Sequence, residues 1–381
     1  MRIVYIYDTI AIIGGIERIF IDKMNFLAEK SHHEVYLLTS SQGNHPISFS
    51  LSKQVKHIDL AINFHLQYRY SYPKRFWLRI KMNSLFRKRV QETIDKIDPD
   101  FIIGTTVWKP SVVCKLKGRG KKIIESHCAR AYTPIPLTHT MGFVKDMLNE
   151  WAAYRQFKVI EKHCDAIVAL TQADAKAWKK AINVYTIPNF TNYILPRSSK
   201  CELPRVIAVG RLVAQKGFDS LISAWKIVNK QFPEWKLDIF GEGIYRERLN
   251  KQIAYNHLTT AITIHPFSRN ILQEYVNSSI LALSSNYEGF GLVLIEAMGC
   301  GLPCVSFDCP QGPSEIIKDK EDGFLIKNGD IEGFAKAICY LIENEEERKL
   351  FGSRARKNVK RYSPEIIMPQ WEQLFNTLLE K

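Results

Sequence analysis

Short β-rich runs alternate with longer amphipathic segments along all 381 residues, and this alternation is the strongest constraint on the fold. A strand, a helix and a further strand in succession give a parallel sheet covered by helices on both faces. The runs that read as strands form two sets of five, at residues 2–7, 34–40, 100–106, 121–126 and 165–171, and at residues 205–210, 235–241, 261–267, 279–285 and 303–308. Because ten strands are too many for one small open sheet, we predict an α/β chain with two doubly wound, Rossmann-like domains.

The domain boundary is predicted within residues 185–205, which are rich in Pro, Ser and Asn. We expect an N-terminal domain over residues 1–190, a C-terminal domain over residues 191–363, and a C-terminal helix over residues 364–381 that crosses back to the first domain. In open α/β sheets, ligands bind outside the carboxyl ends of the strands. Two such domains facing a cleft would therefore carry their functional residues in the turns that follow strands.

The residues themselves disfavour several classes of protein. No uninterrupted apolar run approaches the ~18 residues of a membrane-spanning helix. The apolar N-terminus carries Asp8 and lacks a basic leader, so it reads as a buried strand rather than a signal peptide. The eight cysteines lack the CxxC spacing of a zinc site, which favours small buried side chains in a reducing, cytoplasmic compartment.

Turns after the predicted strands carry glycines and cations. Gly14 and Gly15 open a helix after the first strand, and Gly210 is followed by Arg211 and Lys216. Glycine-rich turns that lead into helices offer free backbone N–H groups at a positive dipole end, which suits a phosphate. Two cations beside such a turn predict a site for a diphosphate.

Two stretches carry a resemblance to a known family: GRLVAQKGFDSLISAW, which begins at Gly210, and NYEGFGLVLIEAMGCGLPCVSFDCPQGPSEII, which begins at Asn286. In the second, seven residues separate Glu288 from Glu296. Both stretches resemble the retaining, nucleotide-sugar-dependent glycosyltransferases of family 4 (glycosyl transferases group 1), which have the GT-B fold. GGIER after the first strand, DAIVALTQADA and IPN fit the same layout, so the resemblance covers essentially the whole chain.

The resemblance implies a role for each matching residue. Glu288 would contact the hydroxyls of the donor sugar, Glu296 the ribose hydroxyls, and His127 the donor sugar from the first domain. Arg211 and Lys216 would neutralise the diphosphate leaving group. We take Glu288, His127, Arg211 and Lys216 as the catalytic set. The other donor-binding residues expected from the layout are Gly14, Gly15, Gly210, Gly241, Phe267, Gly289, Phe290, Gly291, Leu292 and Glu296.

Sugar transfer suits these residues physically. The reaction passes through an oxocarbenium-like state while charge builds on the departing diphosphate, and fixed cations and oriented N–H groups stabilise that charge. We therefore expect neither a metal nor a cofactor besides the nucleotide sugar itself. Asp98 and Asp100 spell D-x-D, but they open a predicted strand rather than end one, so we expect an ordinary turn there. Glutamates near a helix N-terminus, such as Glu288 and Glu296, can also occur only because they interact favourably with the helix dipole. The presence of Arg211 and Lys216 favours a donor site instead.

The net charge of +14 is concentrated in the first half of the chain. Residues 1–190 contain 29 Lys and Arg against 16 Asp and Glu, a difference of +13, and the remainder contributes +1. The basic segment from Arg69 to Val90 holds eight of these cations, no acid, and interleaved aromatic residues. It reads as a basic amphipathic helix at an anionic membrane surface, or as a surface helix packed on the sheet, and both can hold at once. No nucleic-acid motif accompanies the charge, so we expect no nucleic-acid partner.

The sequence therefore predicts a retaining, metal-independent hexosyltransferase. It would move a sugar from a nucleotide diphosphate sugar, UDP-linked, to a growing lipid-linked oligosaccharide or polysaccharide, at the inner face of the cell membrane. A nucleotide-sugar epimerase or hydrolase on the same fold is the alternative, although no second acid/base pair is evident for it. A catalytically silent membrane-binding module would need only the basic segment. A dinucleotide-dependent oxidoreductase is disfavoured, because DTIAIIGGIE replaces the G-x-G-x-x-G turn.

Overall fold

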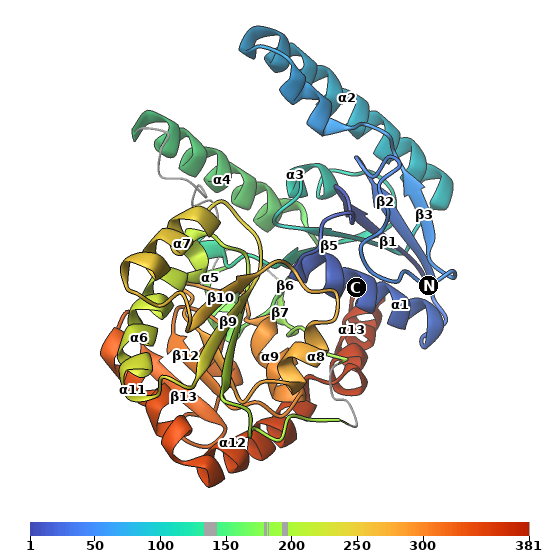
Figure 1. Ribbon diagram of the computed structural model, residues 1–381. Helices are drawn as coiled ribbons and strands as arrows, with labels where there is room; N and C mark the ends of the chain where they lie inside the picture. The colour runs from blue at the N-terminus through green and yellow to red at the C-terminus, as the bar shows by residue number, and fades with distance from the viewer. Residues whose placement is uncertain (133–142, 179–180, 182, 193–196, 381) are drawn as a thin grey trace. The chain divides into compact units, whose positions relative to one another are not determined.

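The computed structural model describes residues 1–132, 143–178, 181, 183–192 and 197–380 (Figure 1). The chain divides into two compact units. The first unit contains the described residues up to 187 together with residues 368–380, and the second contains the described residues from 188 to 367. Each unit is built around one parallel sheet.

The first unit has a seven-stranded sheet in the order β3-β2-β1-β4-β5-β6-β7, and all its strand pairs are parallel. The strands are β1 (Arg2–Tyr7), β2 (Glu34–Thr39), β3 (Lys56–Asp59), β4 (Phe101–Thr105), β5 (Lys121–Ser126), β6 (Ala166–Ala169) and β7 (Val184–Thr186). The helices are α1 (Gly15–Glu29), η1 (Phe64–Arg69), α2 (Tyr72–Ile97), α3 (Pro110–Val113), η2 (Arg130–Tyr132), α4 (Phe143–His163) and α5 (Gln172–Ala177), followed at the end of the chain by most of α13 (Pro364–Leu379).

The second unit has a six-stranded parallel sheet in the order β10-β9-β8-β11-β12-β13. The strands are β8 (Arg205–Val209), β9 (Lys236–Phe240), β10 (Ile262–His265), β11 (Ile280–Leu283), β12 (Cys304–Asp308) and β13 (Gly323–Lys327). The helices are η3 (Ala214–Lys216), α6 (Phe218–Gln231), α7 (Arg246–Tyr255), α8 (Ile271–Val276), α9 (Leu292–Gly299), α10 (Pro313–Ile316), α11 (Ile331–Glu343), α12 (Glu345–Asn358) and η4 (Val359–Tyr362).

Helices cover both sheets because the central strands are apolar on both faces. All four residues of β11 are buried, as are the last five of β1. Helix α6 buries Phe218, Leu221, Ile222 and Trp225, whose spacing of three and four residues places them on one side of the helix. These side chains join residues of β8, β9 and α11 in one continuous core. Two doubly wound α/β units are therefore observed, as predicted.

All ten predicted strands are present, but three further strands were not predicted. These are β3 and β7, at the two edges of the first sheet, and β13, at one edge of the second. They are short, and most of their residues are only partly buried or exposed. An edge strand borders solvent along one side, so it lacks the long apolar run that marks a central strand.

The strand order reverses once in each sheet, and this determines where a ligand can enter. In the second sheet the chain leaves β8 towards β9 on one side, whereas β11 pairs with β8 on the other. The loops after β8 and β11 therefore diverge, and the gap at such a switch point is where open α/β sheets bind ligands. In the first sheet the loops after β1 and β4 occupy the corresponding position.

Among the described residues, no helix has both the length and the apolarity needed to cross a membrane. Helix α2 begins at Tyr72 and contains most of the predicted basic segment. Its second half packs on the sheet through Phe86, Val90 and Ile94, while Trp77 in its first half is exposed. The second half of α2 is thus a surface helix packed on the sheet, and the membrane-surface interpretation of its first half stays a prediction.

Candidate active site

The loop after β8 places Lys216 beside Glu288. Lys216 ends the short helix η3, and Gly217 follows it with a left-handed backbone (φ +56°). A Cβ on Gly217 would lie 2.2 Å from the carbonyl oxygen of Ser284, so only glycine lets this loop pack against the end of β11. The Lys216 Nζ donates a hydrogen bond to Glu288 Oε1 at 2.6 Å, although 72 residues separate the two in the sequence.

Glu288 lies in the turn between β11 and α9 and is 5% exposed. Its Oε1 also accepts a hydrogen bond from Ser285 Oγ at 2.6 Å. Lys216 and Ser285 thus both donate to the same oxygen, Oε1. A buried carboxylate held by one cation and one hydroxyl is fixed in orientation, as a group that must grip a sugar hydroxyl needs to be.

Glu296 lies inside α9 and is 7% exposed. The hydroxyl of Tyr275, in α8, donates to Glu296 Oε2 at 3.2 Å. The two glutamates are therefore supported by different elements, one in a turn and one on the helix that follows.

The glycine turn between the two glutamates begins α9. Gly291 caps the helix in the left-handed region (φ +99°), and Leu292 is its first residue. The backbone N–H groups of a first helical turn have no acceptor within the helix, so those near Leu292 can bind an anion. The ring of Phe290 packs edge-on against that of Tyr362, with the ring centroids 5.6 Å apart. A Cβ on Gly312 would lie 1.9 Å from the carbonyl oxygen of Phe290. The turn is thus held from behind by the β12–α10 loop and η4.

The remaining predicted donor residues of the second unit lie around the same edge. Arg211 is exposed and its guanidinium contacts Gln215 Oε1 at 3.4 Å, with no carboxylate partner among the described residues. A Cβ on Gly241 would lie 1.9 Å from the carbonyl oxygen of Gly210, so the loops after β8 and β9 touch through their backbones. Phe267 follows β10 and is exposed.

In the first unit, Gly14 caps α1 and Gly15 is its first residue. The carboxylate of Glu17 folds back over Gly14, where a Cβ would lie 2.4 Å from Glu17 Oε2. Tyr7 donates to Glu17 Oε1 at 3.0 Å, and burial together with the charge of Glu17 raises the pKa of Tyr7, which keeps it a donor. Glycine at position 14 therefore makes room for an anionic side chain at this helix end. Phosphate binding by Gly14 and Gly15 stays a prediction.

His127 directly follows β5 and is buried. Its Nε2 lies 2.9 Å from Glu125 Oε2, and Lys23 Nζ donates to the same oxygen at 2.5 Å. Glu125 and Lys23 were not predicted as site residues, nor were Ser285 and Tyr275 of the second unit. Two features of the sequence could have indicated the first pair: Lys23 lies on the apolar side of a helix, and Glu125 lies inside an apolar strand.

The D-x-D pair lies at the opposite end of the first sheet from the predicted ligand edge. Asp98 follows α2, Asp100 precedes β4, and both pair with Arg119, at 2.9 and 3.0 Å. The pair thus forms the predicted turn at the start of a strand. No group of three or more His, Cys, Asp or Glu side chains that could hold a metal ion occurs within the described residues.

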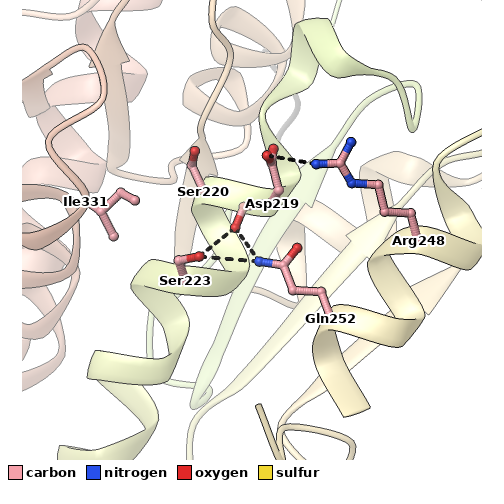
Figure 2. Close-up of a pocket in the computed structure, with 6 residues that line it drawn as sticks. All are labelled: Asp219, Ser220, Ser223, Arg248, Gln252 and Ile331. Carbon is pink, nitrogen blue, oxygen red and sulfur yellow. Dashed lines mark hydrogen bonds and ion pairs between the residues drawn. The ribbon is translucent and has the colours of Figure 1, made fainter. Parts of the chain in front are cut away.

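A separate pocket of about 380 Å³ lies on the second unit, between α6, α7 and the start of α11 (Figure 2). Its polar groups bond to one another: Arg248 pairs with Asp219 at 3.8 Å, and Gln252 donates to Ser223 and to the carbonyl of Asp219. None of the predicted donor residues lines it. We therefore place the candidate active site at the turns after β8 and β11 and not in this pocket.

Residues 197–358 match the family model described as glycosyl transferases group 1. An uncharacterized glycosyltransferase from Haemophilus influenzae is 28% identical over 94% of this chain and 95% of its own length. The amylovoran biosynthesis glycosyltransferase AmsD of Erwinia amylovora is 37% identical over 59% of this chain and 66% of its own length.

A solved structure of Staphylococcus aureus TarM is similar over 98% of this chain and 99% of that chain, with a TM-score of 0.80 and 18% sequence identity. That crystal contained UDP and alpha-GlcNAc-glycerol. At this identity the likeness establishes the fold alone. Together, the fold, the match over residues 197–358 and the relatives support a glycosyltransferase with the GT-B fold.

Proposed function

We propose that this chain is a retaining, family 4 hexosyltransferase that uses a UDP-linked sugar and extends a lipid-linked oligosaccharide or polysaccharide. The observation that carries the proposal is the convergence of Lys216, Ser285 and Glu288 at the switch point of the second sheet. UDP as the nucleotide is supported by the resemblance and by the UDP in the TarM crystal. Polysaccharide as the product is supported by the printed role of the Erwinia relative.

Each residue then acts on one part of the donor. Glu288 accepts hydrogen bonds from sugar hydroxyls through Oε2, because Oε1 is bound by Lys216 and Ser285. Glu296 accepts hydrogen bonds from the ribose hydroxyls, and Phe267 contacts the base. Arg211, Lys216 and the N–H groups of Phe290, Gly291 and Leu292 stabilise the charge that develops on the departing UDP.

Metal independence is part of the proposal. Two cations and a helix N-terminus supply positive charge where the diphosphate departs, which is the task a bound metal performs in other transferases. Activity should therefore persist after exhaustive chelation with EDTA. Loss of activity that added Mg²⁺ or Mn²⁺ restores would contradict this part.

The test of the function is a panel of UDP- and GDP-sugars incubated with the protein and a membrane lipid extract, with release of nucleoside diphosphate as the measurement. Glu288→Ala should lower the rate by about 100-fold or more, the usual effect of losing one transition-state contact. Glu234→Ala, which removes an exposed glutamate just before β9, is the matched control and should keep the wild-type rate. Donor turnover that does not depend on acceptor would instead favour the epimerase or hydrolase. No binding of any donor would reject the function.

Action at the cytoplasmic face of the membrane is proposed from two helices of the first unit. Both α2, which leads into β4, and α4, which leads into β6, run antiparallel to the strands, so their first halves lie at the carboxyl edge. Buried residues of both helices belong to one core, which places them on the same face of the sheet. Figure 1 shows both helices extending beyond this sheet.

Both helices expose aromatic rings, and two rings of α4 have a cation beside them. Trp77 on α2 is 70% exposed and Trp151 on α4 is 56% exposed. Arg155 lies 4.6 Å from the centroid of Trp151, and Lys158 lies 4.6 Å from that of Tyr154. Rings of this kind favour the interface between headgroups and acyl chains, while the cations favour anionic lipids. Helix α4 thus adds a second element to the predicted basic segment.

A further inference from the structure

Three charged or polar side chains meet in the interior of the first unit, beneath the carboxyl end of β5. Lys23 of α1 and His127 both contact Glu125 Oε2, at 2.5 and 2.9 Å. All three residues are buried, and Glu125 is completely inaccessible. Since an ionised group inside a core is costly unless it is paired, this arrangement needs a physical account.

The charges of the cluster compensate one another. Burial raises the pKa of Glu125, but Lys23 and His127 outweigh burial and hold that pKa below its ordinary value. Burial lowers the pKa of Lys23, and the neighbouring Glu125 opposes this. The ammonium of Lys23 also lies 4.0 Å from the ring centroid of Trp371, which stabilises the cation. Glu125 is therefore a carboxylate, and a carboxylate can only accept hydrogen bonds.

The carboxylate determines which nitrogen of His127 carries the proton. Nε2 must donate to Glu125, so whenever the imidazole is neutral its lone pair is on Nδ1. Phe20 packs edge-on against the ring at 5.2 Å and restricts its rotation. The lone pair on Nδ1 is then held in one direction at the end of a strand, where ligands of this fold class bind.

We propose that Lys23 and Glu125 are positioning residues that hold His127 as its Nε2–H tautomer, so that Nδ1 accepts a hydrogen bond from a sugar hydroxyl. This inference rests on the proposed function for the identity of the ligand, but not for the tautomer. Lys23 keeps the carboxylate ionised, Glu125 fixes the proton on Nε2, and His127 alone touches the sugar.

A second histidine–carboxylate pair in the same unit provides a matched control. His33 Nε2 lies 2.9 Å from Glu372 Oε2, the same distance as in the His127 pair. His33 precedes β2 and therefore lies at the amino edge of the sheet, away from the ligand edge. Glu372→Gln changes the same chemistry at a place where no sugar is expected.

The tautomer is tested directly by NMR of the full chain with ¹⁵N- and ¹³C-labelled histidine, with His127→Asn used to assign the signal. The wild type should show neutral His127 protonated on Nε2. The double variant Lys23→Met with Glu125→Gln removes both charges together, so it avoids leaving a buried ion unpaired. It should fold and show a mixture of tautomers at His127. A wild-type proton on Nδ1, or an unchanged signal in the double variant, would overturn the inference.

Kinetics test the consequence. With the donor that the nucleotide-sugar panel identifies, the double variant should lose roughly 2- to 10-fold in kcat/KM, the size expected when one hydrogen bond between neutral groups is weakened and only part of the His127 population keeps the Nε2–H tautomer. Its thermal midpoint should stay near that of the wild type, and Glu372→Gln should keep full activity. Full activity in a double variant whose tautomer is mixed would overturn the positioning role. If the wild type transfers no sugar at all, the proposed function fails while the tautomer result stands.

Discussion

Glu288 depends on two donors for its orientation, and the smaller of them is the more informative to change. Ser285→Ala removes a hydroxyl that lies 2.6 Å from Glu288 Oε1 and leaves the Lys216 contact in place. Because a hydrogen bond to a charged group contributes about 1.5–3 kcal/mol, we expect kcat/KM to fall roughly 10- to 100-fold. Initial rates over a donor titration measure this loss. Ser223→Ala, which also removes a hydrogen-bonded hydroxyl but away from the candidate active site, should show no loss, and an equal fall in both variants would contradict the prediction.

Lys109 is a residue whose charge the fold disfavours. Burial, with the repulsion of Arg79, lowers the pKa of Lys109 from 10.5 to about 8. Between these two values the unfolded chain binds a proton that the folded chain does not, so folding stability rises with pH across this window. Relative to Lys109→Met, the wild type should therefore gain in unfolding midpoint as the pH rises from about 8 to about 10. Thermal unfolding of both proteins in matched buffers measures the difference, which would stay constant if the pKa were ordinary.

At the scale of elements, the second unit brings its loops together by close backbone approach. Gly217→Ala introduces a Cβ 2.2 Å from the Ser284 carbonyl and also strains a left-handed residue. Gly329→Ala is the matched control, because Gly329 has φ +84° but nothing within 4 Å of its added Cβ. Strain alone costs about 1–2 kcal/mol, so Gly217→Ala should destabilise clearly more than Gly329→Ala in chemical denaturation. Only Gly217→Ala should also weaken donor binding, because Lys216 precedes it; equal effects in both variants would contradict a close approach.

A comparison of the elements shows which parts of the structure could be predicted from sequence patterns. Buried central strands such as β1 and β11 were predictable, because both their faces are apolar. The turns after β8 and β11 were predictable from glycine and charge. The edge strands β3, β7 and β13 were not, since their residues are partly solvated. Nor were Lys23 and Glu125 assigned, because 102 residues separate them and only the parallel sheet with its covering helix brings them together.

At the scale of the whole molecule, the charge is distributed unevenly between the halves of the chain. Residues 1–190 carry +13 of the net +14, so the cationic excess belongs almost entirely to the half that includes α2 and α4. Exposed cations attract anionic surfaces over about one Debye length, roughly 8 Å at physiological salt. The first unit is thus suited to contact an anionic surface, while the nearly neutral second half carries the candidate donor site.

Vesicle binding tests this division of tasks. The protein should cosediment with phosphatidylglycerol-containing vesicles but not with pure phosphatidylcholine, and binding should weaken steeply with added salt, since each cation near an anionic membrane contributes about 1 kcal/mol. Trp77→Ser combined with Trp151→Ser should weaken this binding, because the exposed tryptophan ring of each helix is lost. Tyr255→Ser is the matched control, since Tyr255 is 84% exposed on α7 of the second unit.

Equal binding to neutral vesicles, or release by Tyr255→Ser alone, would contradict a membrane-facing first unit. Displacement of the bound protein by a soluble polyol phosphate at low concentration would instead identify an anionic glycan as the partner of the same helices.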